Sequence, residues 1–442
     1  MLFGLCDDIL SHYYGFFKCM KHYLSRFPSD FSSFFVNISL VLYPVSVLLV
    51  PKVNGLIFVL FFIAGLVFII RQREIAFKVS ADEKRLFLAI SIFFFAVLLI
   101  TVMSGFTYKA IGKYLHLLFA IPVYLYLRHA GIKLGYVWYG LVTGSIVAAL
   151  VAFYEVGVLG IPRARSLTHP IVFGDLSLIM GCMSLAGYGW FKQQSSKFVM
   201  LPVLALLCGI FASILSQSRG GWLAIPLLLM AFFWYMHPRF SFRLKAAIAV
   251  GVLVFFTVVY AIPQTGVSYQ VDRTLESLEQ YSDSEITSGK RATSVGTRLE
   301  MWQASWKMFT DNPVLGVGWG HYLEEAKKQV EQGTRNRSAA SFDHPHSQYF
   351  TALASGGLVG FIATMALFLV PAWLFIKYIK QHESDDISRL SLAGLVLIVG
   401  YMAFGISEPL LDRSRSVNFF ALYLVVFMAA IYGQKEVVSR KS

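Results

Sequence analysis

Long apolar runs separated by short polar connections occupy most of the chain. A helix that crosses a bilayer needs about 20 predominantly apolar residues, within a range of about 17–25. Twelve stretches approach that length. They are residues 31–50, 54–70, 86–104, 111–128, 134–158, 171–190, 197–215, 220–236, 244–262, 347–377, 388–406 and 416–433. The pattern predicts an all-α polytopic membrane protein with about 12 transmembrane helices.

The composition agrees with lipid as the main solvent of this chain. Hydrophobic residues make up 57% of its 442 residues and charged residues only 14%, whereas a soluble domain is about 45–50% apolar and about 25% charged. A soluble enzyme, a disordered chain and a disulfide scaffold are therefore excluded. The four cysteines, Cys6, Cys19, Cys182 and Cys208, show no CxxC spacing, so we expect neither a disulfide framework nor a zinc site.

The polar segments divide the chain into five parts. Residues 1–30 are expected to form a cytoplasmic tail without a cleavable signal peptide, because no apolar stretch there leads to a small-residue cleavage site. Residues 31–262 hold nine predicted spans and residues 347–433 the last three. Between them lies one long loop, 263–346, in which we expect helices. Residues 434–442 form a second cytoplasmic tail.

Basic residues give the orientation. With the N-terminus placed in the cytoplasm, the cytoplasmic segments carry 21 Lys and Arg and the short outer segments carry 8. Cytoplasmic loops of membrane proteins collect such residues, so the count favours twelve spans with both termini inside and the long loop outside. This bias also accounts for the net charge of +13, and we expect no nucleic-acid partner.

The second half of the long loop predicts an amphipathic helix over TRLEMWQASWKMFTDNP. Leu299, Trp302, Trp306 and Phe309 recur at three- and four-residue spacing, which predicts one apolar face. Thr297 precedes the run and is expected to help cap the helix. The following LGVGWGHY is glycine-rich; a tight turn explains it better than phosphate binding does.

Two histidines, His344 and His346, stand where the outer loop meets the membrane. An unperturbed histidine has a pKa of about 6.5 and can act as a general base near neutral pH; a histidine satisfied by a neighbour is the alternative. A metal site needs three or four ligands. Asp343 is adjacent, but the outer segments contain no HExxH or DxD pattern, so no metal is expected.

Polar side chains from four connections fall on the outer side of this topology. They are Arg163, Arg165, His169, Asp175, Arg219, Arg298, His344, His346, Glu408, Asp412, Arg413 and Arg415. Arg219 lies between two apolar runs with almost no loop, so its guanidinium needs an anionic partner near the membrane surface. That partner is a phosphate, whose geometry suits the planar guanidinium, or a carboxylate, with Glu408 and Asp412 as candidates.

A substrate with an apolar tail, two phosphates and a sugar fits this set of residues. Activated glycans outside the bacterial cytoplasm are lipid-linked pyrophosphates, whose phosphates match the arginines. A transporter is the competing class. It usually places charged or broken helices at the bilayer midplane, whereas the main mid-chain acids, Glu155 and Asp175, fall near predicted outer ends.

Several motifs together resemble the O-antigen ligase and polymerase superfamily. They are RARSLTHPIVFGDL from Arg163, RGGW from Arg219, RLEMW from Arg298, NPVLGVGWGHY, and HPHSQYFTALASGGLVG from His344. The resemblance covers residues 160–365 most strongly. It implies a GT-C-like, metal-independent, inverting glycosyltransferase without a cofactor, in the inner membrane of a Gram-negative bacterium. The active site would face the periplasm.

The same resemblance implies the substrates and the residues that bind the donor. An O-antigen ligase moves a polysaccharide from undecaprenyl pyrophosphate to lipid A–core, within the surrounding membrane lipids. Arg219 and Arg298 would bind the pyrophosphate and stabilise the leaving group. Arg163 and Arg165, from the preceding outer loop, are further candidates for donor binding.

The remaining roles implied by the resemblance concern the acceptor. His346 would take the proton from the acceptor hydroxyl, and His344 would orient His346 or shape the turn. Asp412 stands where the family has a functional acid, with Glu408 close enough to take that role.

Three alternatives to the ligase activity stay open on sequence grounds. A polymerase would extend the lipid-linked chain with the same donor. A protein O-oligosaccharyltransferase would use a protein acceptor, and a membrane transporter would move the glycan without chemistry. The single large outer loop late in the chain favours the ligase.

Overall fold

The computed structural model describes residues 29–236 apart from 51 and 107, scattered positions between 241 and 287, and residues 288–439. All regular structure in these ranges is helical. The long helices are α2 Ser29–Leu49, α3 Val53–Arg71, α5 Ala81–Met103, α6 Tyr108–Leu127, α7 Leu134–Phe153, α8 Pro170–Ala186, α10 Leu201–Ser216, α12 Ala224–Met236, α15 Ser294–Asp311, α17 Gln348–Gln381, α18 Asp385–Phe404 and α19 Ser414–Ser439. The shorter ones are α4 Arg73–Ala76, α9 Tyr188–Gln194, α11 Arg219–Trp222 and α16 Tyr322–Glu331, with a π-turn at Tyr154–Val158 and 3₁₀ turns at Gly289–Ala292, Arg337–Ala340 and Leu410–Asp412.

These helices confirm an all-α polytopic membrane protein. Seven of the described helices are long and apolar enough to cross a membrane, or eight if α8 and α9, bent by 51°, form one span. Three shorter apolar helices, Ile111–Leu127, Leu201–Ser216 and Gly220–Met236, fall on further predicted spans. Most of the predicted span 244–262 lies outside the described residues. The count of twelve therefore stays a prediction.

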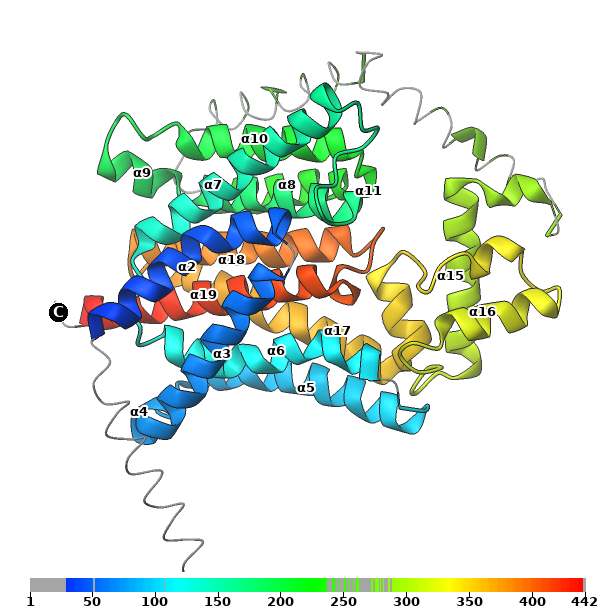
Figure 1. Ribbon diagram of the computed structural model, residues 1–442, viewed down its shortest axis with the longest axis horizontal. Coiled ribbons are helices and arrows are strands. Elements are labelled where there is room, and N and C mark those ends of the chain that lie inside the picture. Colours follow the sequence, from blue (N-terminus) through cyan, green and yellow to red (C-terminus); the bar gives the residue numbers. More distant parts are fainter. Residues whose placement is uncertain are drawn as a thin grey trace, which may run out of the picture.

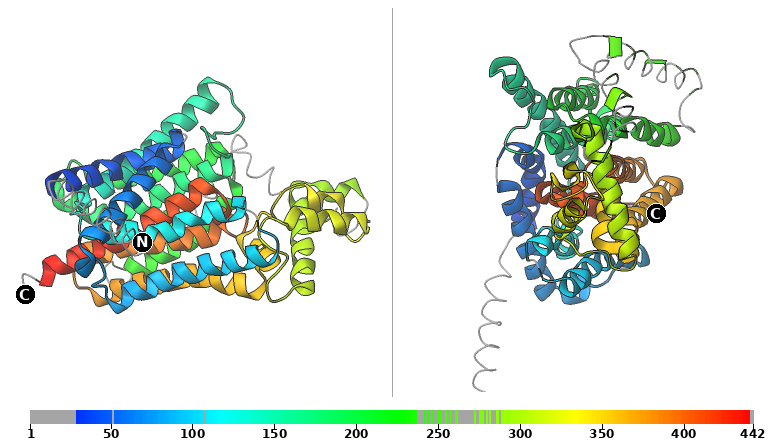
Figure 2. Two further views of the ribbon diagram at one scale, coloured as in Figure 1. Left: turned by 60° about the horizontal axis from the view of Figure 1, so that its bottom comes forward. Right: turned by 90° about the vertical axis from the view of Figure 1, so that its right-hand side faces the viewer.

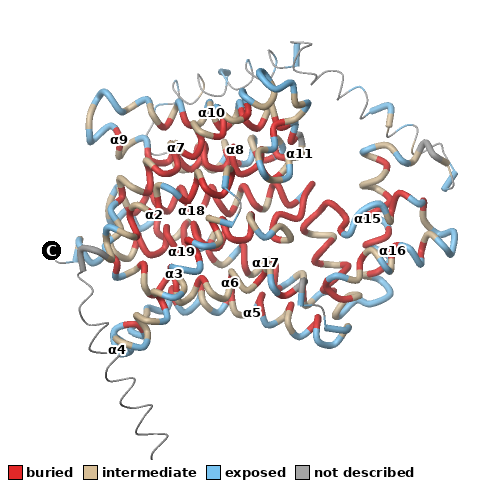
Figure 3. The backbone as a smooth tube through the Cα atoms, viewed as in Figure 1, coloured by how far each residue is buried: buried red, intermediate tan, exposed pale blue. Residues whose placement is uncertain are grey.

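Helices α18 and α19 form the centre of the bundle (Figures 1 and 3). In each of them 89% of the most apolar window is buried, whereas in the peripheral α3 the share is 28%. Peripheral helices instead present large apolar side chains outward, among them Leu56 and Ile63 of α3 and Phe95 of α5. Apolar residues that no protein atom covers are suited to contact with lipid tails.

The bundle has two distinct ends. α4, α9 and the end of α19 lie at one, which we call the opposite end; α11, α15 and α16 lie at the other, which we call the site end (Figures 1 and 2). Buried ion pairs join helices at the opposite end. Glu83 accepts hydrogen bonds from Arg128 and from the hydroxyl of Tyr124, each at 2.7 Å. Asp82 accepts from Lys377 at 2.5 Å. These bonds tie α5 to α6 and α17.

The loop helix α15 begins earlier than the sequence predicted. Its N-cap is Thr293, whose Oγ1 accepts the N–H of Gly296 at 3.1 Å. The prediction that Thr297 caps the helix was wrong. Thr297 lies inside the first turn, because SVG continues the helical hydrogen bonding toward the N-terminus and Thr293 satisfies the free N–H group there.

The buried face of α15 also differs from the predicted one. Met301, Ala304 and Met308 are buried with residues of α16 and of the Arg337–Ala340 turn. Trp306, which the periodicity assigned to the apolar face, is 54% exposed. The spacing of the aromatic residues identified the helix, but small and flexible side chains fill its narrow interface with α16 and the aromatic ones do not.

The glycine-rich segment forms the tight turn that the sequence predicted. The three glycines of residues 316–320 have φ of 65°, 96° and 97°, a region that residues with a Cβ rarely adopt. The N–H groups of Val317 and Gly318 donate to the carbonyls of Ala354 and Ser355 at 2.8 and 3.1 Å. The turn thus runs along the start of α17.

This turn packs against the glycines of the SGGLVG segment in α17. A Cβ at Gly356 or Gly360 would lie within 2.6 Å of the Trp319 ring, and one at Gly357 within 2.5 Å of the Val314 backbone. Gly357, at φ 57° and ψ −153°, also kinks α17. These small residues therefore let the outer loop pack directly against α17.

Candidate functional site

Two turns meet at the site end. The first, residues 341–347, precedes α17 and is called the histidine turn. The second, residues 405–413, joins α18 to α19 and is called the acid turn. The N–H of Gln348 donates to the carbonyl of Gly405 at 2.7 Å, and the side chain of Gln348 accepts the N–H of Leu411 at 3.1 Å. These bonds fix the two turns side by side.

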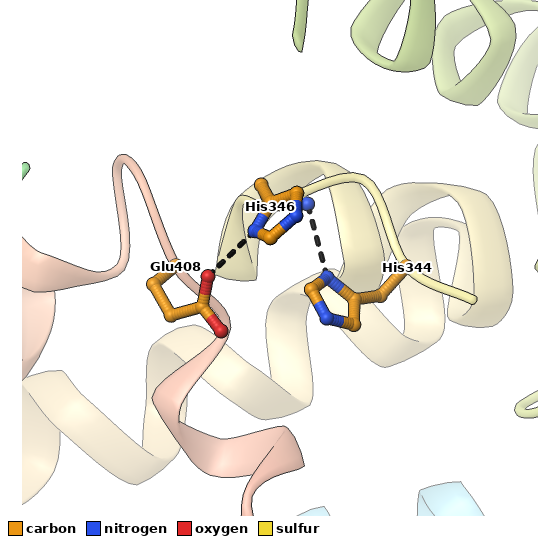
Figure 4. Close-up of side chains that lie close together, drawn as sticks. All are labelled: His344, His346 and Glu408. Carbon is orange, nitrogen blue, oxygen red and sulfur yellow. Dashed lines mark hydrogen bonds and ion pairs between the residues drawn. The ribbon is translucent and has the colours of Figure 1, made fainter. Parts of the chain in front are cut away.

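His346 and Glu408 form the centre of the site. Nδ1 of His346 lies 2.6 Å from Oε2 of Glu408, which is fully buried (Figure 4). Burial raises the pKa of Glu408, but the hydrogen bond from His346 and the neighbouring His344, His346 and Arg413 outweigh it and lower the pKa to about 2. An ionised carboxylate only accepts, so Nδ1 of His346 carries a proton, and in the uncharged form of the ring Nε2 has the free lone pair. The pair presents a base in one tautomer.

The backbone of His346 is held in an unusual conformation. Its φ is 49°, in the left-handed region that costs a residue with a Cβ. Phe342 packs its ring edge-on against the imidazole, with centroids 4.6 Å apart. Such conformations persist where the surrounding structure enforces them, and they gather at functional sites.

His344 lies beside this pair and has a different electrostatic environment. Its Nε2 is 2.8 Å from Nη2 of Arg413, and its Nδ1 is 3.2 Å from the N–H of His346. A neutral imidazole accepts through one nitrogen only, and the shorter bond from the guanidinium is the stronger of the two. Burial, with the nearby His346 and Arg413, lowers the pKa of His344 to about 4 despite the opposing effect of Glu408. His344 is therefore neutral at pH 7, and its Nε2 is hydrogen-bonded to Arg413.

Arg413 links the acid to the second histidine. Its Nε and Nη2 donate to Oε1 of Glu408 at 3.0 and 2.9 Å, while Nη2 also contacts His344. The sequence placed Arg413 among the outer polar residues without giving it a role. Its position five residues after Glu408, in a turn that must close between two helices, is the signal that points to this pairing.

Asp412 serves another part of the site end. Its Oδ1 accepts from Lys113 and, at 2.9 Å, from the hydroxyl of Tyr114, so it ties the acid turn to α6. The sequence had put Asp412 first and Glu408 second as the supporting acid. The structure brings Glu408, not Asp412, to His346.

Arg298 extends the site toward the outer loop. It stands in the first half of α15, and burial lowers its pKa, with the charge of Glu408 acting in the opposite direction. Within the described part of the chain no carboxylate forms an ion pair with Arg298. A desolvated guanidinium without a counter-ion is suited to bind an anion.

The side chain of Arg219 lies outside the described residues, but its backbone opens α11 beside the acid turn. A Cβ at the next residue, Gly220, would lie 1.9 Å from Oγ of Ser407. Nearby, Ser218 donates to Oδ1 of the fully buried Asp175 at 2.6 Å, and Oδ2 of Asp175 has no hydrogen-bond partner among the described residues. The backbone of α11 thus lies beside the acid turn at Ser407.

Arg163 and Arg165 make contacts away from the two histidines. Nε of Arg163 donates to the carbonyl of Ser216 at 3.0 Å, just before the Arg219 turn. The backbone N–H of Arg165 donates to the carboxylate of Glu155 at 2.8 Å. The structure therefore gives Arg163 a contact that braces the segment before α11, and among the described residues no side chain pairs with the guanidinium of Arg165.

One group of side chains has the composition of a metal site. Donor atoms of His344, His346 and Glu408 lie within 4.8 Å of one another. Arg413, however, already contacts both Glu408 and His344, and its fixed positive charge would oppose a cation there. The donor set fits the oriented base better than a metal ion, and metal independence stays a prediction.

Fold and site together define a class: a polytopic helical membrane protein with, at one end, a buried His–Glu pair and an arginine that has no ion-pair partner among the described residues. Comparison with known proteins adds a family likeness. Residues 204–365 match the family model described as O-antigen ligase. The match spans α10 to the first half of α17 and includes Arg219, Arg298, His344 and His346. The part of the chain that carries most of the candidate site is thus similar to this family.

Two relatives extend this finding. An uncharacterized protein of Haemophilus influenzae is 23% identical over 402 residues, which cover 90% of this chain and 98% of that protein. A ComP-specific O-oligosaccharyltransferase of Acinetobacter baylyi is 23% identical over 225 residues, covering 50% of this chain and 37% of that protein. The first match extends along nearly the whole chain, so the likeness is not confined to the family domain.

Proposed function

We propose that the protein is an O-antigen ligase, an inverting and metal-independent glycosyltransferase. It moves a polysaccharide from undecaprenyl pyrophosphate to a sugar hydroxyl of lipid A–core. The observation that supports this most is the 2.6 Å bond between His346 and Glu408, whose charge also acts on Arg298, an arginine with no ion-pair partner in the described part of the chain. A base and a cation at one end of the bundle are what a hydroxyl attack on a sugar pyrophosphate needs.

The reaction is a single displacement. Nε2 of His346 takes the proton of the acceptor hydroxyl as its oxygen attacks the anomeric carbon. The new carbon–oxygen bond forms while the bond from the anomeric carbon to the phosphate oxygen breaks, and undecaprenyl pyrophosphate leaves with that electron pair. Attack from the face opposite the leaving group inverts the anomeric centre. Glu408 holds the tautomer and stabilises the imidazolium that forms.

The arginines act on the leaving group. Arg298 and Arg219 bind the pyrophosphate and stabilise the negative charge that grows as the sugar bond breaks, a contribution worth about 3–4 kcal/mol for a single well-placed donor. Arg163 supports the position of Arg219 through its hydrogen bond to the carbonyl of Ser216, just before the Arg219 turn. Arg165 is left as an outer contact to the glycan or its phosphates.

The topology that goes with this reaction has twelve spans in a GT-C-like arrangement. Both termini are cytoplasmic, and the site end faces the periplasm of a Gram-negative bacterium from its inner membrane. The bias of 21 to 8 basic residues supports this orientation. Two variants, His382→Cys and Ser341→Cys, test this orientation. In intact spheroplasts, a membrane-impermeant thiol reagent should label the new cysteine of Ser341→Cys and not that of His382→Cys.

A protein O-oligosaccharyltransferase is the second candidate. The Acinetobacter baylyi relative carries that name, and its match covers half of this chain. The donor and the roles of His346 and the arginines would be unchanged, and a protein hydroxyl would replace the sugar hydroxyl. A polymerase would likewise keep the donor and change the acceptor.

A purified transfer assay separates these activities. The protein in vesicles receives a polymeric undecaprenyl-pyrophosphate glycan, without nucleotide, together with lipid A–core, a protein acceptor or no added acceptor. Glycan on lipid A–core alone supports the ligase. Glycan on the protein, or longer lipid-linked chains, would replace it with the oligosaccharyltransferase or the polymerase. An intact donor in all three mixtures would favour a transporter.

A further inference from the structure

Trp302 connects the loop helix α15 to the histidine turn. Its indole Nε1–H donates to the carbonyl of Pro345 at 3.0 Å. Its ring stacks on Phe350 in the first turn of α17, with centroids 5.3 Å apart and planes 17° from parallel. One side chain thus binds the backbone of the turn and packs on the helix that follows it.

The bonded carbonyl lies between the two histidines. Pro345 is buried, and its carbonyl belongs to the peptide that leads into His346. Fixing that carbonyl sets the plane of the peptide and hence the direction in which the side chain of His346 leaves the backbone. His346 adopts φ 49°, which needs support from its surroundings. The indole N–H supplies a direct hydrogen bond to this peptide.

The same helix carries the cation of the site. Arg298 lies four residues before Trp302 in α15, so both side chains stand on one face of the helix. A helix moves as a unit, and any shift of α15 would change the position of Arg298 and the support of His346 together.

We propose that Trp302 is a positioning residue for His346. Through Trp302, the position of α15, which carries Arg298, is coupled to the orientation of the His346 imidazole. The inference rests on the function proposed above and deepens it. In this proposal Trp302 acts on His346 through the Pro345 carbonyl and takes no direct part in the reaction. Displacing a base by about 1 Å can lower a rate about 100-fold without changing substrate binding.

The test is Trp302→Phe, which keeps an aromatic ring on Phe350 and removes the N–H donor. The matched control is Trp306→Phe, on the same helix but 54% exposed. We expect kcat of the first to fall about 10- to 100-fold, with the donor KM within twofold and the melting temperature in detergent unchanged. The pH midpoint of kcat should also shift, because the His346 environment changes. The control should match the wild type in all four quantities.

Other outcomes overturn the proposal. Wild-type kcat in Trp302→Phe, an equal loss in both variants, or a loss that follows the melting temperature would each exclude a positioning role. If Trp302→Phe does not accumulate, Phe350→Leu serves as the second variant. It keeps the indole donor of Trp302 but removes the aromatic ring on which the indole stacks, so we expect kcat to fall several-fold. An unchanged kcat would contradict the proposal. His346→Ala distinguishes the two levels: an inactive His346→Ala beside a normal Trp302→Phe removes only this inference, whereas an active His346→Ala removes the proposed function.

Discussion

Each end of the bundle contains a fully buried glutamate, and the two are paired in different ways. At the opposite end Glu83 binds Arg128 and the hydroxyl of Tyr124. At the site end Glu408 binds Arg413 and His346. Both carboxylates join separate helices or turns. At the opposite end every partner keeps its charge state across the physiological pH range, whereas at the site end one partner is a histidine that can take up and release a proton.

The groups around the two glutamates sharpen this contrast. The nearby Asp82 is bound by Lys377 and by the hydroxyl of Tyr378. At the site end Arg298 has no ion-pair partner among the described residues, and Oδ2 of Asp175 has no hydrogen-bond partner. The opposite end also holds an unpartnered polar atom, because Nε of Arg128 has no hydrogen-bond partner in the described part of the chain. What distinguishes the site end is therefore the titratable histidine on its glutamate, together with an arginine that no carboxylate pairs with among the described residues.

The largest effect is expected for His346→Ala. Loss of the base should lower the transfer rate by about 10³-fold or more, at the upper part of the range for general base catalysis. The measurement is transfer per unit of folded enzyme, with the amount in the membrane and the melting temperature as controls. His344→Ala, whose imidazole is occupied by Arg413, should lose much less. The reverse ranking would move the base to His344.

Arg298→Ala should lower transfer by about 10²–10³-fold, because the leaving pyrophosphate loses a half-buried cation. Arg298→Lys should recover part of the activity, since the charge returns without the bidentate geometry. Rates with the lipid-linked donor provide the measurement. Arg335→Ala, elsewhere in the same loop, is the control, and wild-type rates in Arg298→Ala would remove the phosphate role.

Glu408→Gln should lower kcat about 10²-fold per folded molecule, in addition to any fall in the melting temperature from the lost ion pair with Arg413. The amide keeps the volume of the carboxylate but no longer holds Nδ1 of His346 as the proton carrier or stabilises the imidazolium. Asp412→Asn is the matched control in the same turn, because its contacts go to Lys113 and Tyr114. A larger loss in Asp412→Asn would return the supporting role to the residue that the sequence favoured.

Glu83→Gln tests the opposite end and should act on stability alone. Removing one charge of a buried ion pair costs about 3–5 kcal/mol, and Arg128 would be left without its partner. We expect a lower melting temperature and, per folded molecule, transfer within twofold of the wild type. A selective loss of kcat at an unchanged melting temperature would show that both ends take part in the reaction.

The smallest effect concerns pH. The folded protein keeps His344 neutral to about pH 4, whereas the unfolded chain protonates it near its ordinary pKa of about 6.5. The unfolded state therefore binds more protons in this window, and stability falls as the pH drops from 6.5 toward 4. His344→Gln should show a shallower decline of the melting temperature over that range. Parallel curves for the variant and the wild type would contradict the buried neutral state.

The sequence predicted the bundle far better than the site. Membrane spans follow from length and hydropathy, so all predicted spans within the described residues coincide with helices, although their ends differ. The choice between Glu408 and Asp412 could not be read from sequence, because both lie in one short turn and only packing decides which carboxylate meets His346. The buried stripe of α15 was missed for a similar reason: periodicity finds a face, but the neighbours determine which face is covered.

For the same reason, the roles of Arg413 and Trp302 could not be predicted from the sequence. Their partners, Glu408 and Pro345, lie in turns whose course depends on how α17, α18 and α19 assemble. The histidines and Arg298 were found because their chemistry stands out in an apolar chain, whereas the residues that hold them resemble ordinary outer-loop residues.

The stereochemistry of the new glycosidic bond tests the His346–Glu408 mechanism most directly. Purified enzyme in vesicles would transfer a glycan of known anomeric configuration from undecaprenyl pyrophosphate to lipid A–core in the presence of a chelator, and nuclear magnetic resonance would give the configuration of the product. A base that activates the acceptor for one displacement predicts inversion at an undiminished rate. Retention, or loss of transfer that a divalent metal restores, would contradict it.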